Sequence, residues 1–136
     1  MSNNTEVLAY LAGYFDGEGT VGMYPPDFTI RVAVGSTIRS SVDEFASVFG
    51  GSVVKMTRPS RPHIRQVYEW HAYGKVGQAA LEAMLPFLRL KKEQAIVALS
   101  VPAFTGRGRH RAPSTSEVTF RAEAASNLVM LKRKVV

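Results

Sequence analysis

The nine residues Leu11-Ala12-Gly13-Tyr14-Phe15-Asp16-Gly17-Glu18-Gly19 join a helical pattern to a strand pattern. Upstream, apolar residues recur at the spacing of one helical face, which predicts a helix that ends at about Tyr14. Gly17 and Gly19 follow, and glycine adopts backbone angles that other residues resist. The chain is therefore expected to turn sharply out of the helix here. The predicted apolar face comprises Leu8, Leu11, Ala12 and Phe15.

Two strand pairs and further helices are predicted downstream of this bend. Residues 20–24 and 28–35 are rich in β-formers, and a helix capped by Ser36 or Thr37 is expected to run to Phe49. Residues 52–57 and 64–73 form the second predicted pair, and helices over 76–85 and 91–99 follow it. This order, αββαββα, predicts an α+β fold.

The C-terminal part of the chain is strongly basic. From Ala103 onward there are 7 basic residues against 2 acidic ones. Ser114-x-x-Glu117 has the pattern of a capping box and predicts a terminal helix after a basic loop. We therefore divide the chain into a core, residues 1–102, and an extension of the same domain, residues 103–136.

Composition narrows the class of protein before any motif is considered. The chain has 136 residues, which favours one domain, and 17 Lys plus Arg against 11 Asp plus Glu give a net charge of +6. Such an excess points to a polyanionic partner. The absence of cysteine excludes disulfides and thiolate zinc sites. Neither a signal peptide nor a membrane span is evident, so we expect an intracellular protein with no membrane partner.

Residues 11–19 resemble the signature of the LAGLIDADG homing endonucleases. Five of the nine positions are identical, and Glu18 replaces an aspartate of the same charge. Residues 85–95 are similar to the segment by which single-motif members place a basic residue near the active site. The resemblance ends near Pro102. It implies the family's αββαββα core, with an antiparallel four-stranded saddle sheet and helices on one face, and here a C-terminal helix is added.

The resemblance also implies the active-site residues. Glu18 stands at the position of the metal ligand, and Gly17 leaves room for a backbone carbonyl ligand. The implied metal is Mg²⁺, or Mn²⁺ in its place, which suits oxygen ligands and retains waters. Lys91 matches the active-site lysine that stabilises developing phosphate charge, although Lys92 is adjacent and leaves the register open. Asp16 is expected to be structural, holding the turn at the helix end.

One expected feature of the family's active site is absent. Members tend to place a Gln late in the second strand, where it orders water, and this chain has Val34-Gly35-Ser36 there. The gap weakens the expectation of robust cleavage.

Small residues recur four apart on the first predicted helix. Such a strip lets a second helix approach closely, and it also suits packing against the chain's own sheet. The resemblance favours the first use, because the family's motif helices pack together at a dimer centre. One acidic centre per chain and two strands to cut also favour a C₂ homodimer on double-stranded DNA. The predicted interface residues are Ala9, Tyr10, Gly13, Tyr14 and Gly17.

Alternation along the strands selects candidate DNA contacts. A β-ribbon fits the major groove, so polar side chains on the face opposite the helices are the candidates, and a solvated strand face is the ordinary alternative. Trp70 falls on the other parity and is expected in the core. The predicted contacts are Thr29, Arg31, Lys55, Thr57, Arg65, Glu69 and His71, with Arg58, Arg61 and His63 at a hairpin tip.

Two other classes of function stay open at this point. The same saddle could bind DNA, or RNA in a maturase or regulator, with cleavage weakened or lost. A basic structural domain without nucleic acid would explain the charge but not residues 11–19. The leading hypothesis is a Mg²⁺-dependent, site-specific DNA endonuclease that acts as a homodimer.

Overall fold

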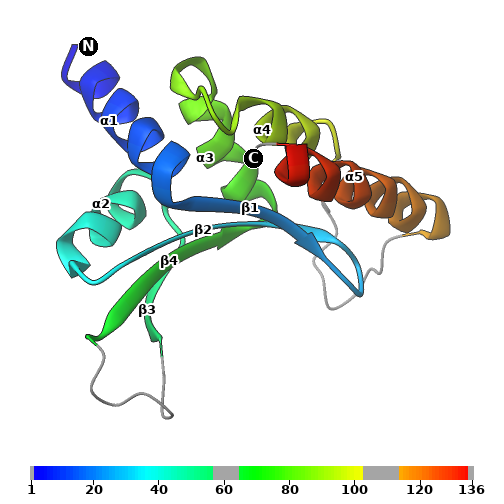
Figure 1. The fold of residues 1–136 in the computed structure, drawn as a ribbon, viewed down its shortest axis with the longest axis horizontal. Coiled ribbons are helices and arrows are strands. Elements are labelled where there is room, and N and C mark those ends of the chain that lie inside the picture. Colours follow the sequence, from blue (N-terminus) through cyan, green and yellow to red (C-terminus); the bar gives the residue numbers. More distant parts are fainter. Residues whose placement is uncertain (1, 57–64, 103–113, 135–136) are drawn as a thin grey trace.

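The computed structural model describes residues 2–56, 65–102 and 114–134 (Figure 1). Its elements confirm the predicted order and the α+β class. They are α1 (Ser2–Glu18), β1 (Gly19–Tyr24), β2 (Thr29–Ser36), α2 (Arg39–Phe49), β3 (Ser52–Met56), β4 (Val67–Tyr73), α3 (Gly74–Met84), the 3₁₀ turn η1 (Leu85–Phe87), α4 (Lys92–Leu99) and α5 (Thr115–Lys134).

The four strands form one antiparallel sheet in the order β1-β2-β4-β3, so β2 and β4 are central. The helices lie on one side of the sheet and leave the other side uncovered (Figure 1). We call this uncovered side the open face. Paired residues of neighbouring strands share a face, so the register assigns the open face to Thr20, Gly22, Tyr24, Thr29, Arg31, Ala33, Gly35, Ser52, Val54, Met56, Val67, Glu69, His71 and Tyr73.

The core lies between the sheet and the helices and centres on Trp70. Its side chain is 0% exposed and stacks on Phe45 with ring centroids 5.0 Å apart. The indole Nε1 donates a hydrogen bond of 2.8 Å to the Gly50 carbonyl, so the buried polar atom is satisfied. Leu11 and Phe15 of α1 are also fully buried. The predicted apolar faces of α1 and β4 are thus confirmed.

The end of α1 differs from the prediction. The helix continues past Tyr14 to Glu18, and neither Gly17 nor Gly19 has a positive φ. A Cβ on Gly19 would lie 2.4 Å from Cδ1 of Phe15, well inside van der Waals contact. Glycine is therefore required at position 19 because the Phe15 ring packs against the backbone there, and not because the chain turns sharply.

The two predicted caps have different outcomes. The capping box is confirmed, since Glu117 accepts from the Ser114 amide at 2.7 Å and Ser114 Oγ accepts from the Glu117 amide at 3.2 Å. Helix α2 instead has Ile38 at its N-cap, without a side-chain cap. Ser36 is not the cap because its Oγ accepts from the Ile38 amide at 3.0 Å, within the turn before the helix.

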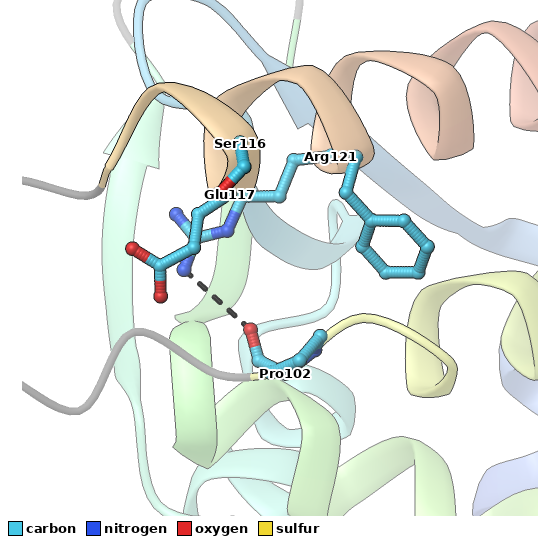
Figure 2. Close-up of a pocket in the computed structure, with 5 residues that line it drawn as sticks. Pro102, Ser116, Glu117 and Arg121 are labelled. Carbon is cyan, nitrogen blue, oxygen red and sulfur yellow. Dashed lines mark hydrogen bonds between the residues drawn. The ribbon is translucent and has the colours of Figure 1, made fainter.

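Helix α5 is fixed to the rest of the fold by Arg121. This side chain is only 3% exposed, and it donates to the carbonyl oxygens of Asp27 at 3.2 Å and Pro102 at 3.5 Å. Figure 2 shows it beside a small pocket of about 210 Å³ that Phe120 also lines. Helix α5 therefore packs on the β1–β2 loop. Among the helices of residues 2–56, 65–102 and 114–134, none has the length and apolarity needed to cross a membrane.

Candidate functional site

Glu18 is the last residue of α1, and its side chain is exposed. It lines a hollow of about 570 Å³ between the end of α1 and the turn that joins β2 to α2. The helix C-terminus carries unpaired carbonyl oxygens and a partial negative charge, and a carboxylate there adds to it. The hollow is therefore suited to a cation. Its other lining residues are Gly13, Tyr14, Gly17, Gly35, Ser36 and Thr37.

Asp16 lies in the last turn of α1 and is 8% exposed. Its Oδ2 accepts from the Arg89 amide at 2.7 Å, and its Oδ1 accepts from the Lys91 amide at 3.0 Å. Both oxygens are thus committed to backbone N–H groups, which agrees with a structural role. The partner differs from the expectation, because Asp16 holds the segment before α4 and not a turn of its own helix.

Lys91 lies against the last turn of α1. Its Nζ donates a hydrogen bond of 2.7 Å to the carbonyl oxygen of Asp16, where the helix dipole favours a cation. Lys92 is exposed and lines a different hollow, with Ala9 and Gly13. The geometry therefore favours Lys91 over Lys92 as the lysine near Glu18.

A further cation reaches this region from α5. Burial lowers the pKa of Lys132, and the positive charge of Lys91 lowers it further. The C-terminal end of α5 therefore adds positive charge near the end of α1. The sequence predicts a terminal helix here, but nothing in its spacing predicts where that helix packs.

The predicted interface residues of α1 divide into two groups. Ala9, Gly13 and Gly17 are exposed, Tyr10 is 53% exposed, and a Cβ on either glycine would meet no atom within 4 Å. This strip does not pack against the chain's own sheet. Tyr14 does not belong with it, because its ring packs edge-on against Phe45 and its hydroxyl lies 3.0 Å from Ser41 Oγ.

The open face brings three predicted contacts together. Arg31 Nη2 lies 2.6 Å from Glu69 Oε1, and His71 Nδ1 lies 3.5 Å from the same oxygen. Thr29 lies on the same face, one pleat along β2. Tyr73, which the strand alternation did not single out, accepts a 3.2 Å hydrogen bond from Arg31 Nε. The available signal was its parity, because Tyr73 alternates in step with Glu69 and His71 along the same predicted strand.

The face of the sheet on which Lys55 lies differs from the prediction. The register pairs it with Tyr68 and pairs Val53 with Trp70, so Lys55 lies on the helix side of the sheet and not on the open face. Alternation along β3 alone does not show how this strand pairs with β4, and that pairing decides the face. Arg65 is exposed just before β4. Thr57, Arg58, Arg61 and His63 lie outside the described residues.

One chain supplies part of a metal site. Among the described residues, no group of three or more His, Cys, Asp or Glu side chains could hold an ion. Glu18 offers an exposed carboxylate, and the Gly17 carbonyl lies at the helix end beside it. Oxygen donors of this kind suit Mg²⁺, which keeps waters and needs few protein ligands. The donor set fits the metal, provided that other ligands come from outside the chain.

Solved structures match almost the whole chain. The homing endonuclease I-CvuI, bound to the I-CreI target in the presence of Mg, matches with a TM-score of 0.72 and 20% identity over 95% of this chain and 83% of that chain. The same enzyme bound to its own target in the presence of Ca gives 0.73 and 20% over 96% and 85%.

This chain has the LAGLIDADG homing endonuclease fold. The archaeal intron-encoded homing endonuclease I-Vdi141I, complexed with DNA, shares it at a TM-score of 0.69 and 12% identity over 93% of this chain and 84% of that chain. No family model matches the sequence, and no curated protein matches it. The LAGLIDADG fold is thus detected through the structure and through the short segments quoted above.

Proposed function

We propose that this chain is a site-specific, divalent-metal-dependent DNA endonuclease that acts as a homodimer on a long, roughly palindromic site. The observation that carries the proposal is the end of α1, where the exposed Glu18 carboxylate lies on the same helix turn that Lys91 contacts. The LAGLIDADG fold supports it, because the three similar structures are DNA complexes of homing endonucleases.

Each residue of the site has a distinct task. Glu18 and the Gly17 carbonyl would hold the metal, which neutralises phosphate charge and activates water when it is bound. Lys91 stabilises negative charge that develops on the scissile phosphate. Asp16 keeps Lys91 in place by accepting hydrogen bonds from the backbone N–H groups of Arg89 and Lys91. The hydroxyls of Ser36 and Thr37 orient water in the hollow, where the chain has no Gln.

The homodimer follows from the exposed strip on α1. Ala9, Gly13 and Gly17 carry little or no side chain, so two copies of α1 can approach closely about a two-fold axis. That packing would bring two Glu18 carboxylates near one axis and supply one centre for each DNA strand. The positive charge of Lys91 and Lys132 lies where the duplex would cross.

The test is cleavage of a plasmid library with a randomised insert in Mg²⁺, followed by sequencing of the new ends. Wild-type protein is expected to give linear product from a restricted set of sites. Glu18→Gln is expected to bind the same sites without cutting them, since it keeps shape and removes charge. Light scattering is expected to give twice the chain mass. Equal cutting by both proteins would contradict the role of Glu18, and a stable monomer would contradict the dimer.

A second candidate function is DNA or RNA binding without cleavage, as in a maturase or regulator. The observation that favours it is the hollow itself, where Gly35, Ser36 and Thr37 stand in place of a longer polar side chain. Salt-sensitive retention of one sequence, without any cut, would support this function over the first.

A further inference from the structure

Arg31 is the centre of a side-chain cluster on the open face. It lies on β2, and its two partners, Glu69 and Tyr73, lie on β4, the other central strand. Nη2 donates to Glu69 Oε1 at 2.6 Å, and Nε donates to Tyr73 Oη at 3.2 Å. The guanidinium also lies 5.9 Å from the centroid of the Tyr73 ring. These contacts fix both the position and the plane of the arginine head.

The cluster leaves specific hydrogen-bonding groups unused. Within the described part of the chain, no hydrogen bond engages Arg31 Nη1 or Glu69 Oε2. Burial lowers the pKa of Arg31, but the Tyr73 hydrogen bond and the Glu69 charge more than offset it, so the pKa is raised. The head is therefore a permanent cation with one free N–H edge, next to a carboxylate with a free oxygen.

The surroundings of the cluster leave it partly exposed, with 24% of the Arg31 side chain and 18% of the Glu69 side chain accessible. Ala33 and Gly35 pair with His71 and Glu69, so small residues of β2 face the longer side chains of β4. On β1, Gly22 pairs with Arg31, and a Cβ there would lie 2.2 Å from Tyr24 Oη. The Tyr24 ring thus folds over Gly22, on the side of Arg31 away from β4.

His71 lies near the same oxygen of Glu69 that Arg31 contacts. Its Nδ1 is buried, has no hydrogen-bond partner in the described structure and lies 3.5 Å from Glu69 Oε1. Its ring also packs edge-on against Tyr73 at 5.3 Å between centroids. Glu69 is therefore flanked by Arg31 and His71, and the carboxylate has little freedom to turn away.

This donor and acceptor pattern matches one base pair. In the major groove, guanine presents the acceptors N7 and O6, and cytosine presents the donor N4, while adenine presents a donor beside its acceptor. Arg31 can donate only, and the free oxygen of Glu69 can accept only. An A·T pair presents its groups in another order, with the adenine donor between two acceptors. The free N–H edge of Arg31 finds two adjacent acceptors only on guanine, so an A·T pair would leave one of its donors unpaired, which costs binding free energy.

We propose that Arg31 and Glu69 act as one reading unit that selects a G·C pair in each half-site, with Arg31 on guanine and Glu69 on the cytosine amino group. The unit rests on the proposed function for its ligand, duplex DNA, and for the two half-sites of a homodimer. Glu69 also repels phosphate, so the Arg31 charge is reserved for base edges. Tyr73 and His71 are positioning residues.

The experiment is selection of bound duplexes from a randomised pool, with Ca²⁺ present so that the DNA stays intact. Wild-type protein is expected to enrich G·C at one position of each half-site. Arg31→Gln is expected to move that preference to A·T, because Gln pairs bidentately with adenine. Glu69→Gln and Arg31→Lys are expected to lower discrimination at this position by about 5- to 150-fold.

The matched control is Arg39→Gln. Arg39 also has a carboxylate partner, Asp43 at 3.5 Å, and lies 5.5 Å from the Tyr68 ring centroid, but it is on α2. This variant is expected to keep the wild-type base preference. Thermal unfolding of every variant separates a loss of fold from a loss of selectivity.

The outcomes separate the two proposals. If neither Arg31→Gln nor Arg31→Lys changed the base preference at any position, the reading unit would be overturned. The endonuclease proposal would be unaffected. Selection that follows Arg31 without cleavage in Mg²⁺ would support the reading unit and contradict the endonuclease. Absence of any salt-sensitive binding to DNA would overturn both.

Discussion

The end of α1 and the open face of the sheet use charge in opposite ways. At the end of α1, the buried Asp16 is fully bonded to backbone amides, and Glu18, two residues later, is exposed on a hollow. On the open face, Glu69 and Arg31 are already paired within one chain. Under the proposed function, the first region needs another chain, a metal and DNA to complete it, whereas the side chains of the second are already paired within one chain. We infer that assembly completes the cutting site, while the reading site is built by folding alone.

Lys91→Met tests the cutting site most severely. Removing the ammonium group is expected to lower the cleavage rate by about 10²- to 10³-fold. Binding is expected to stay close to wild type, which single-turnover cleavage and equilibrium binding measure separately. Lys92→Met is the matched control and should cut at close to the wild-type rate. The reverse ranking would show that the register of the lysine is shifted by one residue.

Asp16→Asn tests whether the two hydrogen bonds to Asp16 hold the segment before α4 against the end of α1. The amide is the same size but cannot accept both N–H groups, so one buried donor loses its partner. The free energy of unfolding is expected to fall by about 1.5–3 kcal/mol, measured by denaturant titration. Glu18→Gln should leave stability nearly unchanged because its side chain is exposed. A neutral Asp16→Asn would show that the segment before α4 is held by other contacts.

Gly13→Ala tests whether a second chain completes the cutting site. Within one chain, the added methyl meets no atom and should stabilise α1 by about 1 kcal/mol. Between two chains, the same methyl should separate the helices and weaken the dimer by about 1–3 kcal/mol. Sedimentation or light scattering over a dilution series measures the second effect. The control is Ser47→Ala, an exposed position on α2, which should leave the dimer unchanged. If Gly13→Ala also left the dimer unchanged, the interface would lie elsewhere.

Lys55→Ala is expected to have the smallest effect. Lys55 lies on the helix side of the sheet, so the base preference of the variant in the selection experiment should match that of wild type. Any loss of affinity should be uniform across sequences, as for a phosphate contact. If Lys55→Ala changed the selected base, Lys55 would contact a base edge. Its assignment to the helix side of the sheet would then be wrong.

The sequence predicted what depends on local pattern. The order of elements, the buried Trp70 and the capping box at Ser114 all follow from periodicity or from short-range hydrogen bonds, and all are confirmed. The end of α1 was predicted too early. Glycines in a row suggested a turn, and only the packed structure shows that the Phe15 ring requires Gly19.

The candidate site was predictable only in part. Glu18 and Lys91 came from the resemblance, and the geometry brings them to the same helix end. The face of Lys55 depends on strand register, which no single strand encodes. Asp16 accepts from residues 73 and 75 positions away, and Lys132 approaches Lys91 from another helix. Such long-range contacts have no signature in a local stretch of sequence.

Strand β2 carries both regions. Arg31 lies near its start, and Gly35 and Ser36, which line the hollow beside Glu18, lie at its end. Four residues of extended chain span about 13 Å, close to the rise of four stacked base pairs. Under the two proposals, β2 would keep a constant distance between the selected base and the broken bond. Mutations that change which base is chosen should leave the spacing of the cuts untouched.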